Sequence, residues 1–316
     1  MATGNPFPYS DTNKRYHTYD YYVKHTFGEK CVKIPLDGGF TCPNVDGTCG
    51  VGGCIYCAHG GGGHGADSTL PLAEQYRAGR EKIRLKWGTP PAIAYFQSGT
   101  NTYAPLARLK ELYEEALSFP HVVGLSVATR ADCLPDEVLV YLESLTARTA
   151  VTLELGLQTA SDETAERINR CHTYREFESA YWRIRRLAPH VRIGVHLILG
   201  LPHEGEDTML ESVRRVAALA PDEVKLHLLY VVAGTPLADL YLRGEYTPLS
   251  REAYVQLVAK ALCLLPPKTV VGRLTGDGEG SELLAPLFSR DKRRILNEID
   301  KTLAARDWWQ GINYQE

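Results

Sequence analysis

The chain has 316 residues, 44% of them hydrophobic, which is enough to form one large α/β domain or two small ones. Its formal net charge of −3 gives no global basic signal for binding to nucleic acid. It has eight cysteines, and its N-terminus lacks the apolar stretch of a secretory signal. Together these features argue against a secreted protein with a disulfide framework. No apolar run reaches the length of a membrane span. We therefore expect a cytoplasmic protein without a membrane partner.

Short β-like runs alternate with longer helical patterns, an order that predicts repeated βα units and a parallel sheet. We expect strands at residues 31–36, 92–97, 122–127, 151–155, 191–199 and 223–230. We expect helices at 70–86, 106–117, 135–145, 162–168, 176–187 and 208–219, and a further strand in the tail at 269–274. Six such units form either an incomplete barrel or an open doubly wound sheet, and both bind ligands at the carboxyl ends of their strands.

Three cysteines follow the first expected strand, in GGFTCPNVDGTCGVGGCIYCAHGGGG. Cys54 and Cys57 are separated by two residues, so their thiolates can reach one metal centre from a single turn, and Cys42 lies upstream across a Gly-rich loop. Three thiolates on a [4Fe–4S] cluster leave one iron open to a substrate or cofactor, which predicts an enzyme. Cys49 keeps an alternative open, because a fourth thiolate would close a structural zinc site or an electron-transfer cluster.

The segment Cys54-Ile-Tyr-Cys57 resembles the end of the radical S-adenosylmethionine (SAM) motif, whose commonest version has a shorter first spacing. A long first spacing is typical of the group that includes the catalytic subunit of Elongator. GFTCPNVDGT and GGCIYC are similar to the small bacterial YhcC/YtqA-type radical SAM proteins. Later segments resemble the same family, from about Tyr19 to Leu303: YFQSGTNTYAP, ATRADCLPDEVL, LELGLQTA, HLILGLPHE, KLHLLYVVAGTPLADLY and RLTGDG.

The resemblance implies an incomplete (β/α)6 barrel at residues 31–246, preceded by an extension at 1–30 and followed by an α/β extension at 247–316 packed on the core. It also implies a radical SAM enzyme whose [4Fe–4S] cluster is held by Cys42, Cys54 and Cys57. In that family SAM chelates the open iron, and an electron cleaves it to a 5′-deoxyadenosyl radical that abstracts a hydrogen from substrate. The electron is expected from a donor such as flavodoxin or ferredoxin.

Polar residues at the ends of the second and third strands are candidate SAM contacts. Gln97 and Ser98 end the second strand, where relatives contact the SAM amino group with a Gly-Gly-Glu-like motif that this chain lacks. Thr129 and Arg130 follow the third strand. A guanidinium forks onto a carboxylate, so Arg130 is expected to bind SAM or a substrate anion, or else to pair with Asp132.

The fourth strand and the helix after it provide further candidates. Glu154, Gly156 and Gln158 alternate and therefore share a face, and an acid pointing into a barrel needs a partner or a ligand. The resemblance places Glu154 and Gln158 in the SAM site. It also places Arg167 near SAM, although a solvated helix face is the plain alternative for that residue.

The fifth strand, HLILGLPHE, contains His196, Ile198 and Gly200, and its backbone is expected to recognise the adenine of SAM. His196 is either a ligand contact or a packed core histidine. Glu204 is expected to cap the next helix.

Lys225 and His227 lie two apart on the sixth strand, so they face one side and are the candidates for contact with substrate. Two further features are open to either interpretation. Arg273 and Asp277 bind substrate or pair with each other, and the Gly-rich stretch at 59–64, with a histidine at each end, is expected to be flexible cover near the cluster.

Three functions remain from the sequence. YtqA-type proteins are associated with maturation of the wobble-uridine aminomethyl group, so one is a tRNA enzyme that converts carboxymethylaminomethyl-uridine to aminomethyl-uridine. A basic tail helix with Lys292, Arg293, Arg294 and Lys301 would then contact phosphates. The acidic net charge favours a radical SAM enzyme acting on a small molecule or peptide. The third is a non-enzymatic iron–sulfur or zinc protein that uses Cys49.

Overall fold

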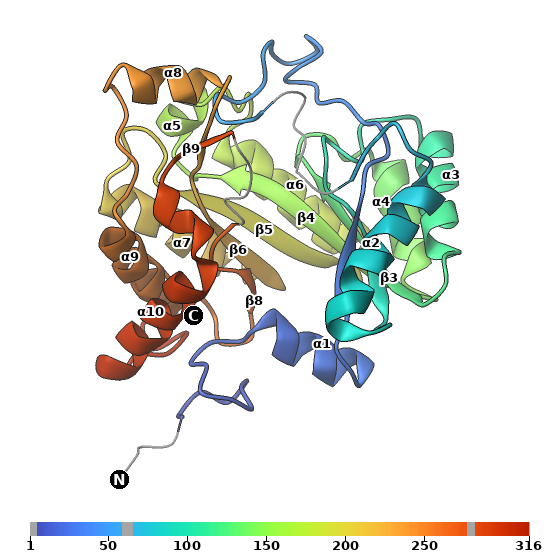
Figure 1. Cartoon of the computed structure of the whole chain (residues 1–316). Helices are drawn as coiled ribbons and strands as arrows, with labels where there is room; N and C mark the ends of the chain where they lie inside the picture. Colours follow the sequence, from blue (N-terminus) through green and yellow to red (C-terminus); the bar gives the residue numbers. More distant parts are fainter. Residues whose placement is uncertain (1–4, 59–65, 277–281, 316) are drawn as a thin grey trace.

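The computed structural model describes residues 5–58, 66–276 and 282–315. Its centre is a parallel sheet of seven strands in the order β1-β2-β3-β4-β5-β6-β8 (Figure 1). The strands are β1 Val32–Leu36, β2 Ala92–Phe96, β3 Val122–Thr129, β4 Ala150–Gln158, β5 Arg192–Leu199, β6 Glu223–Leu228 and β8 Val270–Arg273. Since β1 and β8 lie at opposite edges of the sheet, the expected incomplete barrel is confirmed.

Helices connect successive strands and cover the outer face of the sheet (Figure 1). They are α2 Leu72–Trp87, α3 Leu106–Leu117, α4 Asp136–Leu145, α5 Asp162–Arg167, α6 Tyr174–Leu187, α7 Glu206–Ala218, α8 Pro236–Leu242 and α9 Arg251–Leu264. A small antiparallel pair, β7 Val231–Val232 and β9 Leu283–Ala285, lies outside the main sheet. No helix in the described part of the chain is long and apolar enough to cross a membrane.

The two-residue period of the strands separates a hydrophobic outer face from a polar inner one. On β4, Leu153 and Leu155 are fully buried in the core that the outer helices complete. The side chain of Glu154, which lies between them, points the opposite way, into the half-barrel. This alternation makes the outer face the hydrophobic core and leaves the inner face available for chemistry.

The two ends of the chain pack together on one edge of the sheet. The tail strand β8 joins the main sheet beside β6, and Thr18, just before α1 Tyr19–Phe27, bridges to Val271 of β8. The side chain of Gln310, which is fully buried, accepts from the amide of His17 at 2.8 Å and donates to the carbonyl of Thr269 at 2.8 Å. The division at residues 30 and 246 stays a prediction, although the tail supplies a strand of the central sheet.

Candidate functional site

The cysteine loop between β1 and α2 packs on segments that follow other strands. The amide of Thr100, after β2, donates to Thr41 at 3.0 Å. Ile55 donates to Ile168, at the end of α5, and accepts from Leu237, in α8, at 3.1 and 2.9 Å. Because these partners follow β2, β4 and β6, the loop lies over the carboxyl ends of the strands, where parallel sheets bind ligands.

Two thiols of the triplet, those of Cys54 and Cys57, are in contact. The amide of Cys57 donates to the carbonyl of Cys54 at 2.9 Å, which closes the turn between them. The Cys57 thiol hydrogen-bonds to that of Cys54 and lowers the pKa of Cys54 to about 6, with smaller contributions from Tyr56 and Arg130. The pKa of Cys57 is raised, mainly by the same bond, and Cys42 adds to this through its charge. The site therefore favours a thiolate, the form that binds metal.

The donor set fits a three-ligand cluster better than a closed zinc site. In the described ranges, no three cysteine, histidine or acidic side chains gather closely enough to hold one metal ion. A zinc site needs its sulfurs about 2.3 Å from a single ion, whereas the ligands of a four-iron cluster bind different irons and lie farther apart. Cys49 is exposed and lines a cavity with Tyr103 and Cys133.

A buried ion network lies on the inner face of the sheet, centred on the carboxylate of Glu154, which is 1% exposed. Five donors from five other strands, β1, β2, β3, β5 and β6, reach this carboxylate: Lys33, Tyr95, Ser126, His196 and Lys225. The distances from Lys33, Tyr95, Ser126 and His196 are 2.5, 2.9, 2.8 and 2.8 Å. We call these six residues the Glu154 network.

Charges within the Glu154 network shift its pKa values. Burial alone would raise the pKa of Glu154, but Lys225 and Lys33 hold it well below its usual range. Burial, with Lys33 nearby, lowers the pKa of Lys225 to about 8. Burial and Lys225 lower the pKa of His196, and burial and His196 lower that of His227 further, so both imidazoles are neutral near pH 7. Their ring centroids are 5.1 Å apart.

Comparison with known proteins decides the family. The sequence model of the "Radical SAM superfamily" matches residues 47–216, and that of the "Radical_SAM C-terminal domain" matches 221–305. The chain is 43% identical to "Uncharacterized protein YtqA" of Bacillus subtilis, covering 100% of this chain and 98% of that protein. The chain belongs to the radical SAM superfamily. It is therefore a radical SAM enzyme, and the expected [4Fe–4S] cluster and SAM are its cofactors.

Two further similarities connect this radical SAM protein to Elongator. It is 31% identical to "Elongator complex protein 3" of Danio rerio over 159 residues, 49% of this chain and 28% of that protein. The solved structure of archaeal Methanocaldococcus infernus Elp3 shares its fold, with a TM-score of 0.61 and 18% identity over 86% of this chain and 63% of that one. When bound, the cluster and SAM supply a 5′-deoxyadenosyl radical. The residues of the chain hold both and position the substrate.

Several predicted SAM contacts of this radical SAM protein have protein partners in this structure, and their contact with SAM stays a prediction. Arg130 forms a two-bonded pair with Asp132, at 2.9 and 2.7 Å, and donates to the carbonyl of Arg170 at 2.8 Å, so the predicted alternative is the one observed. Thr129 is buried and its hydroxyl lies 2.5 Å from that of Thr102. Glu154 has all its lone pairs directed at protein donors. In this structure its carboxylate holds the five donor side chains of the Glu154 network in place.

The predicted SAM contacts on β4 and β5 lie near the cluster loop, and their role stays a prediction. The side-chain amide of Gln158, whose φ is +64°, lies over Gly156, where a Cβ would meet the end of that amide at 2.6 Å. Ile198 packs in the same hydrophobic cluster as Ile55 and Tyr56 of the cysteine loop. Gly200, with φ +96°, ends β5 in a conformation that favours glycine, and its carbonyl accepts from Tyr246 at 2.8 Å.

Two predicted contacts retain a buried polar atom without a partner. The hydroxyl of Ser98, at the carboxyl end of β2, and Nε2 of His227, on β6, have no hydrogen bond within the described residues. Gln97, next to Ser98, is half-buried. Because buried polar atoms are nearly always satisfied, Ser98 and His227 are the positions where a bound ligand would complete the structure.

One expectation is wrong, that of Glu204, another stays a prediction, and others fall outside the description. Glu204 does not cap α7, since Gly205 is the N-cap; the Glu204 carboxylate accepts from Thr159 at 2.5 Å instead. Arg167 is exposed and bonds to Glu163 one turn earlier at 2.6 Å, so its contacts do not support a role near SAM. Asp277 and the Gly-rich stretch at 59–64 lie outside the described residues.

Arg170, three residues after Arg167, is the arginine that sequence reasoning missed. It is 1% exposed and donates to the carbonyls of Leu157, Thr159 and His172, linking the end of β4 to the segment after α5. Its position three residues after Arg167 did not indicate that Arg170 is buried. The helix α5 ends at Arg167, and the residues after it turn inward.

Replacing Arg170 by alanine is expected to lower the free energy of unfolding by about 3 kcal/mol or more, because each buried carbonyl left without a donor costs about 1–3 kcal/mol. Urea unfolding would measure this loss. Arg170→Lys should recover little of it, since an ammonium cannot form the same fork of bonds. Arg167→Ala is the matched control and should unfold like the wild type. Equal midpoints for Arg170→Ala and Arg167→Ala would contradict the assignment.

Proposed function

We propose that the protein modifies a tRNA wobble uridine, converting its carboxymethylaminomethyl substituent to aminomethyl. The observation that carries the proposal is the 31% identity to Elongator complex protein 3 over 159 residues, together with the resemblance of the whole chain to the YtqA type. Hydrogen abstraction at the glycine-like carbon of the substituent would leave a carbon radical, and loss of a second electron from it to the oxidised cluster would give an imine. Hydrolysis of this imine by water would then release aminomethyl-uridine and glyoxylate, which carries away the two carbons of the carboxymethyl unit. A donor such as flavodoxin or ferredoxin would supply the electron.

The charges of the inner face support a substituent with both an amine and a carboxylate. Lys33 and Lys225 provide positive charge, and Glu154 and Glu223 negative charge; Lys33 lies 3.7 Å from Glu223. Neutral His227 adds an unpartnered nitrogen on the same strand as Lys225. We infer that Lys225 and His227 contact the substituent, because a glycine-like group presents one charge of each sign within a few atoms.

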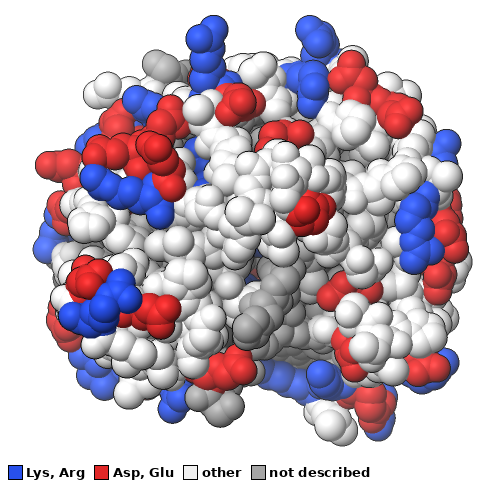
Figure 2. Space-filling view, turned by 90° about the horizontal axis from the view of Figure 1, so that it is seen from above, with Lys and Arg blue, Asp and Glu red and all other residues white. Residues whose placement is uncertain are grey.

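The face above the barrel supports entry of a base rather than a phosphate chain. Figure 2 shows that uncharged side chains make up much of the described surface of this face and that charges of both signs are scattered around its rim. A nucleobase presents a flat, weakly charged surface, and enzymes that act on a base take it out of the stack into a pocket. Phosphate contacts would then lie elsewhere on the molecule.

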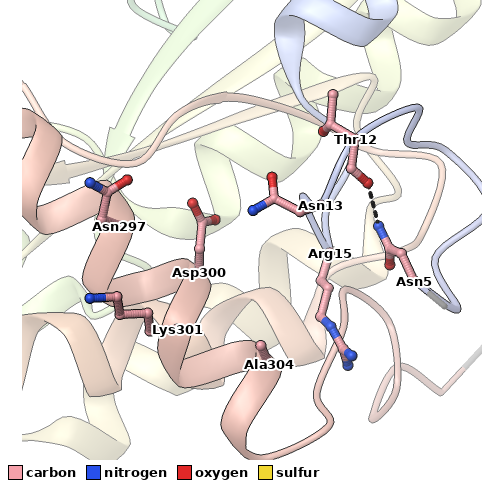
Figure 3. A pocket seen from close by; sticks show the side chains of 8 residues that line it. All are labelled: Asn5, Thr12, Asn13, Arg15, Asn297, Asp300, Lys301 and Ala304. Atoms are coloured by element: carbon pink, nitrogen blue, oxygen red, sulfur yellow. Dashed lines mark hydrogen bonds between the residues drawn. The ribbon is translucent and has the colours of Figure 1, made fainter. Parts of the chain in front are cut away.

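The cavity between the N-terminal segment and α10 Lys292–Ala305 is a candidate for those contacts. It has a volume of about 500 Å³, and Figure 3 shows Asn297 and Lys301 on the helix and Asn13 on the opposite segment. Arg293, Asn297 and Lys301 are exposed and four residues apart, so they form one stripe along α10. Within the described ranges no carboxylate pairs with Arg293 or Lys301, whereas Arg294 bonds to Glu298 at 2.9 Å.

The double variant Arg293→Ala/Lys301→Ala is expected to weaken tRNA binding and to reduce the slope of log affinity against log salt by about 1.4 to 1.8, since each of the two phosphate contacts contributes about 0.7–0.9. Fluorescence anisotropy at several salt concentrations measures both quantities. Arg84→Ala, an exposed arginine on α2 paired with Glu81, is the matched control and should bind like the wild type. An unchanged slope in the double variant would exclude this helix from the tRNA interface.

The proposed function is tested by anaerobic reconstitution of the cluster, addition of dithionite and SAM, and assay of 5′-deoxyadenosine. We expect stimulation by tRNA lacking the late wobble modifications, and aminomethyl-uridine in the nucleosides recovered from it. tRNA that already carries aminomethyl-uridine is the control and should not stimulate. Production of 5′-deoxyadenosine that no tRNA stimulates would overturn the tRNA proposal and favour a small molecule or peptide.

A further inference from the structure

Asn44 lies two residues after Cys42 and is completely buried, with 0% exposure. Its side-chain nitrogen donates to the sulfur of Cys54 at 3.5 Å and also to the backbone carbonyl of Asn169. Its side-chain oxygen accepts from the thiol of Cys171 at 2.9 Å. Both N–H groups and the carbonyl of the amide are therefore engaged, and one N–H points at a sulfur of the cysteine triplet.

Neighbouring residues hold this arrangement in place. The side chain of Asn169 also binds the cysteine loop, because it donates to the carbonyls of Val51 and Gly53 at 3.0 and 2.8 Å. Gly50 leaves the space that the pair occupies: a Cβ there would lie 2.5 Å from the Asn44 oxygen and 2.7 Å from the Cys171 sulfur. A side chain at position 50 would have to displace one of them.

Two groups fix which way the amide of Asn44 faces. The backbone carbonyl of Asn169 can only accept, so it holds the nitrogen end, and the Cys171 thiol lies 2.9 Å from the oxygen end as a donor. The oxygen therefore stays toward Cys171 and an N–H stays toward Cys54. With the amide reversed, the carbonyl oxygen would meet a thiolate sulfur, and two electron-rich atoms would be opposed. Cys171 lies 127 residues from Asn44 in the sequence, so this relation depends on the fold.

We propose that Asn44 is a positioning residue that sets the reduction potential of the cluster through its N–H···S bond to Cys54, and that the Cys171 thiol, together with the carbonyl of Asn169, fixes the orientation of its amide. A reduced cluster carries one more negative charge than an oxidised one, and some of that charge resides on the ligand sulfurs. A donor aimed at a sulfur therefore stabilises the reduced state and raises the potential. Burial strengthens the effect, because little water screens the N–H dipole.

The test is an EPR-monitored redox titration of the reconstituted protein, with iron content measured for each variant. Asn44→Leu keeps the size of the side chain and removes the donor, so its midpoint potential should shift to a more negative value. Cys171→Ala should give a smaller shift in the same direction. Cys171→Ser, which keeps a hydrogen-bond donor, should restore the wild-type potential.

Asn169→Ala is the matched control. It removes two bonds to the loop and one acceptor for the Cys171 thiol, but no donor to a cluster sulfur. A merely structural role for Asn44 would lower cluster retention in both asparagine variants and leave the potential of the loaded protein unchanged. Asn44→Leu with full iron and the wild-type midpoint potential would overturn the proposal. If Asn44→Leu does not retain the cluster, Cys171→Ala decides: an unchanged potential in that variant overturns the proposal as well.

Discussion

Serine at position 42, 54 or 57 is expected to abolish cluster binding and to lower 5′-deoxyadenosine formation by more than about 100-fold. Changes in the outer shell of a metal site alone cost about 10–100-fold, and these variants each remove a ligand. A serine hydroxyl stays protonated near pH 7, whereas the environment of Cys54 lowers its pKa to about 6 and favours the thiolate. Iron and sulfide analysis, with chromatography of the nucleoside product, measures both losses.

Cys49→Ser is the matched control, because Cys49 lies in the same loop but is exposed and lines a separate cavity. This variant should keep its iron and its activity. Loss of the cluster from Cys49→Ser to the same extent as from Cys54→Ser would instead indicate four protein ligands. A four-ligand cluster has no open iron for SAM, so that result would contradict the role of the site in catalysis.

Glu154→Gln is expected to lower the free energy of unfolding by about 3–5 kcal/mol, the usual cost of removing one partner from a buried ion pair. The side chains of Lys33 and Lys225 are 17% and 7% exposed, and both depend on this carboxylate for their nearest negative charge. Without it, two ammonium groups would face each other in the barrel with little water to separate them. Urea unfolding near pH 7 measures the loss.

A double-mutant cycle separates the ion pair from general disruption. Lys225→Met should lower the free energy of unfolding less in the Glu154→Gln background than in the wild type. In that background the lysine has already lost the negative charge that balances it. Additive effects of the two changes would contradict a direct pair. Arg148→Ala, at an exposed pair with Glu114, should leave the unfolding midpoint unchanged.

The pH dependence of the Glu154 contribution has a defined sign. The folded-state pKa of Glu154 lies below its ordinary value of 4.5, so the native state binds fewer protons than the unfolded state as pH falls through this range. Its stabilisation is therefore fully present above pH 4.5 and is lost as pH falls toward the lower folded value. The difference between wild type and Glu154→Gln should stay constant from about pH 7 to 5 and narrow only below about pH 4.

The strands of the main sheet and the helices α2 to α7 could be predicted from the sequence because each depends on local periodicity, whereas α1, α8 and the pair β7–β9 were not predicted. The alternation that predicted a shared face for Glu154 and Gly156 holds on β4. The partners Lys33, Tyr95 and Ser126 could not be predicted, because they reach Glu154 from other strands whose register no local pattern specifies. The tail strand was likewise predicted, but its place beside β6 was not, because pairing is a long-range choice.

The site was predicted where the ligand spacing is local and missed where the backbone conformation is unusual. Cys54 and Cys57 come from one turn, so their spacing indicates their function. Arg170 and Cys171 depend on a segment in which Asn169 and Cys171 have φ angles of +56° and +63°. Non-glycine residues rarely adopt this conformation, and the residue types at these positions do not predict it. The tertiary contacts that hold the segment are visible only in the structure.

All three cysteines of the triplet come from a single loop between β1 and α2, and the hydrophobic core that joins the sheet to its helices contains none of them. We therefore expect the sheet and its helices to fold without the metal, in contrast to zinc fingers, whose folding and metal binding are one event. The enzyme would then be assembled in two stages, folding of the chain and later insertion of the cluster. On this expectation, a protein that loses its cluster by oxidation keeps its fold and can take up a new cluster.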